Sequence, residues 1–252
     1  MKLLILLILF LLNINIISQD NHSLFSRILS KNVYDGHVNY KGILSGKSLD
    51  KYLEQLTNTN PDTIKNSNDR MAFWINAYNA YTLKAIVDNY PVESINDLHS
   101  GGLILGSIFS TTVWDKDFVI VNNEETSLNT IEHKILRKKF NEPRIHFAIV
   151  CASISCPPLR NEAFEGYKLE DQLTDQAQLF LNDETRNKFE LESKEASISK
   201  IFDWFDEDFG DNDEKVFQFI SKYVPDNISK SIKENVSDWD IDYLDYNWNL
   251  NE

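Results

Sequence analysis

The residues with the most reactive side chains gather in two neighbouring stretches of the sequence. Residues 151–156 begin and end with a cysteine, and Glu132 lies directly before His133 a short distance upstream. Thiol nucleophiles use a cysteine, an imidazole that takes its proton and a third group that orients the imidazole. We therefore predict Cys156 as a nucleophile, His133 as its base and Glu132 as the orienting group. This set predicts a thiol-dependent hydrolase or acyl transferase.

The two cysteines can also have structural roles. In an oxidising compartment Cys151 and Cys156 can be joined by a disulfide that ties the chain to its own turn. Cys151 can also be a small buried apolar residue. Paired CxxC and HExxH spacings are absent from the sequence, as are a glycine-rich phosphate loop and a GxSxG turn. We predict no metal and no cofactor.

Two asparagines stand out in the long apolar segment of residues 70–89. Asn76 and Asn79 are three positions apart, so on a helix they share a face. A buried amide that lacks partners costs about 1–3 kcal/mol, so both side chains need hydrogen bonds. They either tie neighbouring loops to the helix or line a polar pocket.

Further polar residues surround the cysteines. Residues 145–151 have the length and apolarity of a buried strand that runs into a loop of small residues, a place that ligand sites favour. Strand alternation would put His146 and Cys151 on opposite faces, which leaves His133 as the better base. The candidate ligand-binding residues are Asn76, Asn79, His146, Ser153 and Arg160.

Glu132 lies within an apolar stripe on the helix that Ser127 is expected to cap. The stripe consists of Leu128, Ile131, Ile135 and Leu136. At about 100° per residue Glu132 falls inside this stripe, so we predict that it is buried. A buried carboxylate has to pair with a cation or take up a proton. The candidate partners are Arg137, Arg144 and Arg160.

The elements that position these residues are mostly helices. A short helix and then a turn, with the break at Asp35 and Gly36, are predicted within residues 24–40. Further helices are predicted over residues 49–56, 70–89, 127–139, 169–182 and 215–223. Strands are predicted over residues 112–114 with 118–121, over 145–151, as a pair within 190–199 and over 241–246. The fold class is α+β, a single helix-rich domain with a small mixed or antiparallel sheet around a buried central helix.

Composition narrows the class of protein. The chain has 252 residues, 42% of them hydrophobic, with 25 Lys and Arg against 39 Asp and Glu. This apolar content excludes a disordered chain. The formal net charge of −14 argues against nucleic-acid binding and against docking on anionic lipid. Two cysteines are too few for a disulfide scaffold.

The N-terminal segment is typical of a secretory signal peptide. Lys2 precedes an apolar run over residues 3–12 and a polar exit. Asn13 and Asn15 leave the run short of the roughly 20 apolar residues that span a bilayer, which disfavours a membrane anchor. We predict a signal peptide over residues 1–19, one globular domain over residues 20–252, a periplasmic or secreted location and no membrane span after cleavage.

Three stretches of this chain resemble a known family. Residues 73–80, 127–137 and 144–160 are similar to motifs of the domain of unknown function 547. Shorter similarities at residues 172–173, 180–182 and 200–205 extend the resemblance from residue 24 to the end of the sequence. The resemblance implies a stand-alone domain of exported bacterial proteins, and the family name carries no activity.

A second hypothesis comes from a different class of protein. The chain can be a non-catalytic binding module of the cell envelope, with bridged cysteines and a polar pocket for a small molecule, a peptide or an envelope component. Whether it is an enzyme is left open by the sequence. The redox state of the cysteines discriminates the two hypotheses.

Overall fold

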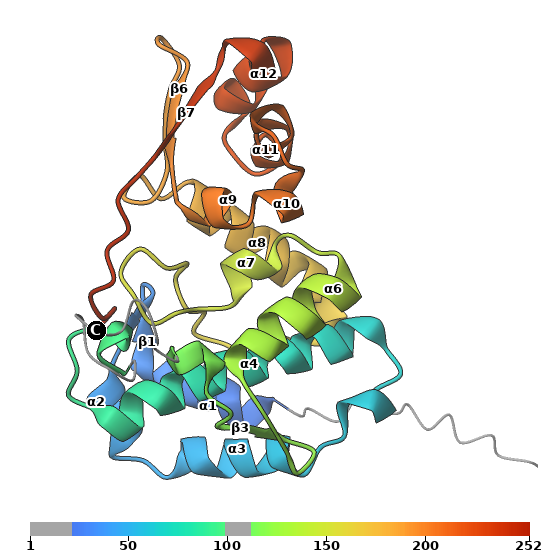
Figure 1. Ribbon diagram of the computed structural model, residues 1–252, viewed down its shortest axis with the longest axis vertical. Helices are drawn as coiled ribbons and strands as arrows, with labels where there is room; N and C mark the ends of the chain where they lie inside the picture. Colours follow the sequence, from blue (N-terminus) through green and yellow to red (C-terminus); the bar gives the residue numbers. More distant parts are fainter. Residues whose placement is uncertain (1–21, 99–111) are drawn as a thin grey trace, which may run out of the picture.

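The computed structural model describes residues 22–98 and 112–252, so the predicted signal peptide lies outside the described residues. Helices dominate the fold (Figure 1). The α-helices are α1 Ser23–Asn32, α2 Tyr40–Leu44, α3 Ser48–Thr57, α4 Ser67–Asn89, α6 Arg137–Phe140, α7 Ile145–Ala148, α8 Leu169–Leu181, α9 Ile201–Trp204, α10 Asp206–Phe209, α11 Asp213–Ile220 and α12 Asp226–Glu234. A π-helical segment, η4 Thr130–Leu136, precedes α6, and short 3-10 turns are η1 Pro61–Thr63, η2 Ile95–Leu98, η3 Val113–Asp115, η5 Gly166–Lys168 and η6 Val236–Asp238.

The described strands are short and form three small sheets. They are β1 Val33–Tyr34, β2 His37–Val38, β3 Val119–Val121, β4 Glu124–Thr126, β5 Lys188–Glu190, β6 Glu195–Ile198 and β7 Asp240–Tyr243. The largest sheet is mixed, because β5 pairs antiparallel with β6 and β6 pairs parallel with β7. The predicted fold class is confirmed. The strand pair predicted within residues 190–199 forms, but its first strand lies earlier, at residues 188–190, and the strand predicted over residues 241–246 ends at Tyr243. The hairpin predicted between residues 112–114 and 118–121 is wrong. Strand β3 pairs with β4 instead, and residues 113–115 form a 3-10 turn.

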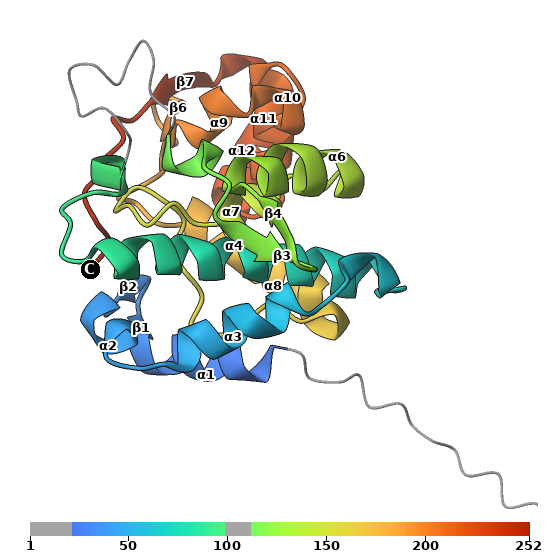
Figure 2. The same cartoon turned by 60° about the horizontal axis from the view of Figure 1, so that its bottom comes forward.

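Helix α4 is the centre of the fold. Its side chains are buried almost all round, as its apolar sequence predicts. Figure 2 shows α1, α2 and α3 on one side of α4 and α6 and α7 on the other. The helix begins earlier than the predicted cap at Asp69, because the side chain of Asn66 accepts the N–H groups of Asn68 and Asp69. It ends at Asn89, before Pro91 as predicted.

The predicted strand over residues 145–151 is wrong. Residues Ile145–Ala148 form one helical turn, α7, and the chain becomes extended only at Ile149. All four residues of α7 are buried, with Phe147 in the core cluster of the C-terminal part and Ile145 in the cluster around α4. Because every face of the turn is covered by protein, and even the polar His146 is buried, the sequence shows no alternation of exposed and buried positions, and periodicity cannot separate helix from strand.

The chain after β7 returns to the N-terminal helices. Figure 1 shows it running from the C-terminal helices down to the end of α4. On the way it follows the cysteine loop, where Ile154 donates its N–H to the carbonyl of Asn249 at 2.9 Å and Asn251 donates to the carbonyl of Ala152 at 3.2 Å. Tyr40 then donates its hydroxyl to Asn251 Oδ1 at 2.6 Å. This C-terminal tail, residues 244–252, therefore joins the N-terminal helices to the cysteine loop.

No helix in the described ranges 22–98 and 112–252 combines the length and apolarity needed to cross a membrane.

Candidate functional site

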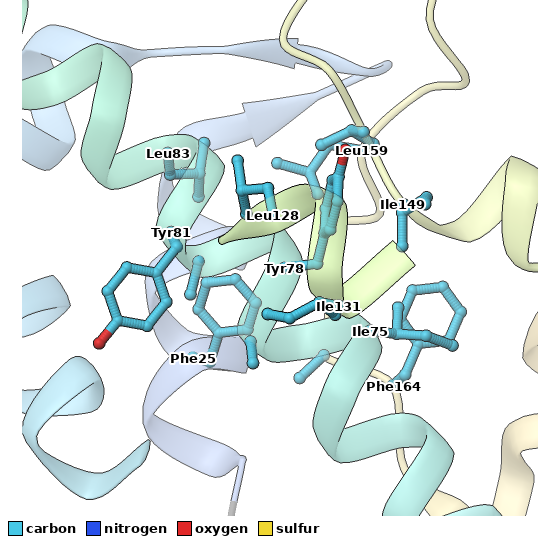
Figure 3. Packing of buried hydrophobic residues seen from close by; sticks show 14 of the residues in the cluster. Phe25, Ile75, Tyr78, Tyr81, Leu83, Leu128, Ile131, Ile149, Leu159 and Phe164 are labelled. Atoms are coloured by element: carbon cyan, nitrogen blue, oxygen red, sulfur yellow. The ribbon is translucent and has the colours of Figure 1, made fainter. Parts of the chain in front are cut away.

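The helix that carries Glu132 has an unusually wide turn. Ser127 Oγ accepts the N–H of Thr130 at 3.1 Å, which confirms the predicted cap. From Thr130 to Leu136 the helix is of the π type, and the N–H of Arg137 reaches the carbonyl of Glu132, five residues back. Such segments occur frequently at functional sites. Figure 3 shows Leu128 and Ile131 of this helix among the buried side chains around α4, with Tyr78 beside them.

Glu132 is buried, as predicted, with 7% of its surface exposed. Its Oε2 atom accepts a hydrogen bond from the hydroxyl of Tyr78 at 3.2 Å. Burial raises the pKa of Glu132 to about 7, against opposing contributions from Tyr78 and the charge of Arg137. Among the described residues no arginine forms an ion pair with Glu132. Near neutral pH this carboxyl can therefore give or take a proton.

His146 lies between two carboxyl groups. Its Nε2 is 2.6 Å from Asp208 Oδ2, and its Nδ1 is 4.0 Å from Glu132 Oε1. A carboxylate at Nε2 fixes the neutral tautomer with the proton on Nε2 and the lone pair on Nδ1. The ring stacks on Phe205 with centroids 4.0 Å apart. Burial lowers the pKa of His146, although Asp208 opposes this change. His146 thus directs an unprotonated nitrogen towards Glu132.

Arg137 links Asp208 to His133. Its Nε donates to Asp208 Oδ2 at 2.5 Å, and its Nη1 donates to His133 Nδ1 at 3.0 Å. Burial acts to raise the pKa of Asp208. The hydrogen bonds from His146 and Arg137 outweigh burial and lower this pKa to about 2. Partial burial, together with the charge of Arg137, lowers the pKa of His133. Because His133 accepts at Nδ1, its neutral form carries the proton on Nε2 and is a donor there.

The two cysteines face each other across the loop. Both are free thiols, and their Sγ atoms lie 2.7 Å apart. Cys156 Sγ accepts the backbone N–H of Cys151 at 2.7 Å. Cys151 Sγ is 3.1 Å from Ser153 Oγ and 3.1 Å from the hydroxyl of Tyr246 in the C-terminal tail. Cys151 is therefore surrounded by groups that can donate to a thiolate.

These neighbours separate the pKa values of the two thiols. Burial acts to raise the pKa of Cys151, but hydrogen bonds from Cys156, Ser153 and Tyr246 outweigh it and bring the pKa down to about 7. Burial raises the pKa of Cys156 well above its usual value, and the neighbouring Cys151 raises it further. These contacts favour the thiolate at Cys151 over the thiolate at Cys156.

The backbone between the cysteines is strained. Ala152 has φ +60°, a left-handed conformation that costs a residue with a side chain about 1–2 kcal/mol. The carbonyl of Ala152 and the N–H of Ile154 are both hydrogen-bonded to the C-terminal tail, which holds the loop in this conformation. Strained residues of this kind occur at functional sites.

The acid, the imidazoles and the thiols line one cavity of about 190 Å³. Its polar lining residues are Asn129, Glu132, His133, His146, Cys151 and Cys156, and Tyr78 and Tyr246 also contribute. The three residues predicted as a catalytic set, Cys156, His133 and Glu132, thus all line this cavity. Within the described residues, neither His133 nor His146 hydrogen-bonds a cysteine sulfur.

Asn76 and Asn79 lie outside the lining of this cavity and hold loops against α4. Asn76 donates to the carbonyl of Phe164 at 2.8 Å and accepts the N–H of Phe164 at 2.9 Å. Asn79 donates to the carbonyl of Ala148 at 2.9 Å and accepts the N–H of Val150 at 3.0 Å. Asn79 therefore fixes the chain directly before Cys151.

Of the other candidate ligand-binding residues, two lie at the site and one lies away from it. Ser153 is buried beside Cys151, and His146 lines the cavity. Arg160 lies elsewhere, bound to Glu162 at 3.0 Å and to Asp175 at 2.9 Å.

Three residues of the site have no strong signal in the sequence. Tyr78 adjoins Asn79 on an apolar helix, so its sequence context predicts only a residue of the hydrophobic core. Asp208 lies in an acidic segment in which nothing local distinguishes it, and Tyr246 lies in the tail, 95 residues from Cys151. The contacts of Asp208 and Tyr246 depend on the tertiary fold alone.

In the part of the chain that the structure describes, no group of three or more His, Cys, Asp or Glu side chains is arranged to hold a metal ion.

Fold and site together define a helix-rich α+β domain with a pair of thiols in a cavity. Residues 61–181 match the family described as Protein of unknown function, DUF547. This confirms the resemblance over the stretch that contains α4, η4 and both cysteines, whereas Asp208 and Tyr246 lie beyond it. No curated protein and no solved structure matches the chain.

We expect Asp208→Asn to lower the pKa of His146 further. Asp208 raises this pKa through its charge and its hydrogen bond, so removing the charge leaves the effect of burial less opposed. Imidazole signals in an NMR pH titration measure the change. Glu207→Gln is the matched control, because Glu207 is exposed and reaches Arg137 only at 4.0 Å. An unchanged His146 titration in Asp208→Asn would contradict the assigned contact.

Proposed function

We propose that this protein is a thiol-dependent hydrolase or acyl transferase whose nucleophile is Cys151. The observation that carries the proposal is the set of hydrogen-bonding groups around Cys151 Sγ, formed by Ser153, Tyr246 and Cys156, in a cavity that also contains Glu132. A thiolate that exists near neutral pH beside a carboxyl group with a pKa of about 7 supplies both a nucleophile and an acid.

The reaction proceeds in two steps. The Cys151 thiolate attacks the carbonyl carbon of an ester, a thioester or an amide, so that a carbon–sulfur bond forms and the bond to the leaving group breaks. The leaving group takes a proton from the protonated form of Glu132. Water, or a second alcohol or amine, then attacks the thioester and gives its proton back to Glu132, which regenerates the thiolate.

His146 and Asp208 act as positioning residues in this proposal. Asp208 fixes the tautomer of His146, whose Nδ1 faces Glu132 and holds a proton-accepting group next to it. His133, the base expected from the sequence, is turned into a donor by Arg137 and so supports the developing charge of a bound carbonyl group.

The geometry favours Cys151 over Cys156, the nucleophile expected from the sequence. Cys156 is the more buried of the two, and its sulfur already accepts the backbone N–H of Cys151. In addition, the pKa of Cys156 is raised, so it remains a thiol near neutral pH and donates to the thiolate of its neighbour.

Alkylation with iodoacetamide tests the proposal. In the folded, reduced protein we expect labelling at Cys151, with a rate that reaches half its maximum near pH 7. Cys151→Ser should remove both the labelling and the hydrolysis of p-nitrophenyl acetate. In the matched variant Cys156→Ala, labelling should persist at Cys151 with its midpoint moved to higher pH, because one hydrogen-bond donor is gone.

A specific observation favours a second candidate function. The sulfur atoms are 2.7 Å apart, so a small movement would bring them to the ~2.05 Å of a disulfide. A stable bridge would leave no thiolate and would support the non-catalytic binding module. A Cys151–Cys156 cross-linked peptide in a non-reduced digest, together with no labelling of the folded protein, would overturn the thiol mechanism and favour this second function.

We also propose that residues 1–19 direct export to the periplasm or the exterior. The support is the basic residue, apolar run and polar exit of this segment. N-terminal sequencing of the protein recovered outside the cytoplasm tests it, with a start near residue 20 expected. A protein that still begins at Met1 would contradict the proposal.

A further inference from the structure

We infer that the acyl group accepted by this cavity is short, neutral and apolar, of the size of a six-carbon chain or a single ring. The inference rests on the proposed function, since it names the substrate class of the same site. It is carried by the walls of the cavity, by the lack of positive side chains in its lining and by its volume.

Much of the cavity wall is aromatic. Trp114, Trp204 and Trp248 line the cavity with Phe205 and Tyr246. The rings contact one another, with centroids 5.8 Å apart for Trp204 and Trp248 and 6.0 Å apart for Trp114 and Trp248. Aromatic side chains offer a large apolar surface with few polar atoms to satisfy. This wall therefore offers an extended apolar surface to a bound hydrocarbon group.

The charges around the cavity do not match an ionic group. Its lining contains no lysine and no arginine among the described residues. Arg137, the nearest guanidinium to Glu132 in sequence, is occupied by Asp208 and His133. A carboxylate or phosphate would thus lose its hydration without a counter-charge. Below neutral pH Glu132 is mostly protonated, so a cation would find only aromatic faces as partners there.

The volume limits the length of the group. A cavity of about 150 Å³ in an apolar core holds benzene. This cavity of about 190 Å³ is slightly larger, so it holds a ring or a chain of about six carbons. A long fatty acyl chain would have to leave most of its methylene groups in water.

Binding of unreactive amides tests the inference without requiring turnover. Three of the five tryptophans line the cavity, so intrinsic fluorescence reports its occupation. At pH 6 we expect hexanamide to bind saturably and at least about tenfold more tightly than hexanoate or hexylammonium. Butanamide should bind about 15-fold more weakly than hexanamide, because each buried methylene contributes about fourfold.

Two variants locate the binding. Trp204→Ala should weaken hexanamide several-fold, and its partial exposure of 43% makes the fold tolerant of the change. Tyr167→Ala is the control, because Tyr167 is exposed and does not line the cavity. Equal binding of the charged analogues, no gain with chain length, no saturable binding of hexanamide, or an unchanged affinity in Trp204→Ala would each overturn the inference.

The two proposals fail in different ways. Amide binding as expected, with no hydrolysis of p-nitrophenyl esters that depends on Cys151, would reject the proposed function and keep the cavity preference. Hydrolysis that depends on Cys151 but shows equal rates for acetate and hexanoate esters would reject the preference alone.

Discussion

Replacing Asn79 by alanine is expected to lower the free energy of unfolding by about 4 kcal/mol. The amide of Asn79 accepts the N–H of Val150 and donates to the carbonyl of Ala148, and the whole side chain is buried. Alanine would leave both backbone groups without partners at about 1–3 kcal/mol each. Urea or thermal denaturation monitored by circular dichroism measures the loss.

Asn89→Ala is the matched control for this substitution. Asn89 is the exposed last residue of the same helix, and its side chain hydrogen-bonds only the carbonyl of Ala85 one turn earlier. We expect a change of less than about 1 kcal/mol there. Equal losses in the two variants would show that Asn79 does not hold the chain before Cys151.

Glu132 should make the protein lose stability as the pH rises from 4.5 to 7, against the opposite contributions of His133 and His146, whose pKa values are lowered in the folded protein. The pKa of Glu132 is about 7 in the folded protein and 4.5 in the unfolded chain, so between these values the folded state binds more protons. The free energy of unfolding therefore falls with rising pH, by about 3 kcal/mol for this single group. Denaturation at pH 4.5, 6 and 7.5 measures the fall.

Glu132→Gln should remove this part of the pH dependence, because glutamine keeps the shape of the protonated side chain and does not ionise. Glu124→Gln, at an exposed position of β4, is the control and should leave the pH dependence unchanged. A wild-type protein that gains stability over the same range relative to Glu132→Gln would contradict a raised pKa.

Glu132→Ala should destabilise the fold more than Glu132→Gln does at pH 5. Alanine leaves the buried hydroxyl of Tyr78 without its acceptor and creates a cavity beside it. Melting temperatures of the two variants distinguish the roles of the residue. If Glu132 is catalytic, Glu132→Gln retains the melting temperature at pH 5 and loses ester hydrolysis.

The helices around the site follow from local patterns in the sequence. Residues 70–89 are apolar on every face and end before a proline, and such a pattern predicts a central buried helix. The position of Glu132 within an apolar stripe predicted its burial. The strand expected over residues 145–151 failed because full burial removes the contrast between polar and apolar positions on which periodicity depends.

The contacts between residues of the site could not be predicted from the sequence. Tyr246 meets Cys151 across 95 residues and Asp208 meets His146 across 62, so both contacts arise from how the C-terminal helices and the tail pack. Sequence reasoning located both thiols, but it could not tell which of them is ionised. That difference depends on hydrogen bonds from Ser153 and Tyr246, and the contact with Tyr246 exists only in the folded chain.

The C-terminal tail also sets when the thiol becomes reactive during biosynthesis. Ribosomes make the chain from its N-terminus, so Cys151 emerges long before Tyr246 and before Asn249 and Asn251, which hold the strained loop. Until residues 246–251 have been synthesised and have paired with the loop, Cys151 lacks the hydrogen bond from Tyr246, and the loop that places Ser153 and Cys156 around its sulfur is not held by the tail. The lowered pKa of Cys151 is therefore a property of the completed fold, because the contact with Tyr246 forms only after the C-terminal tail has been made.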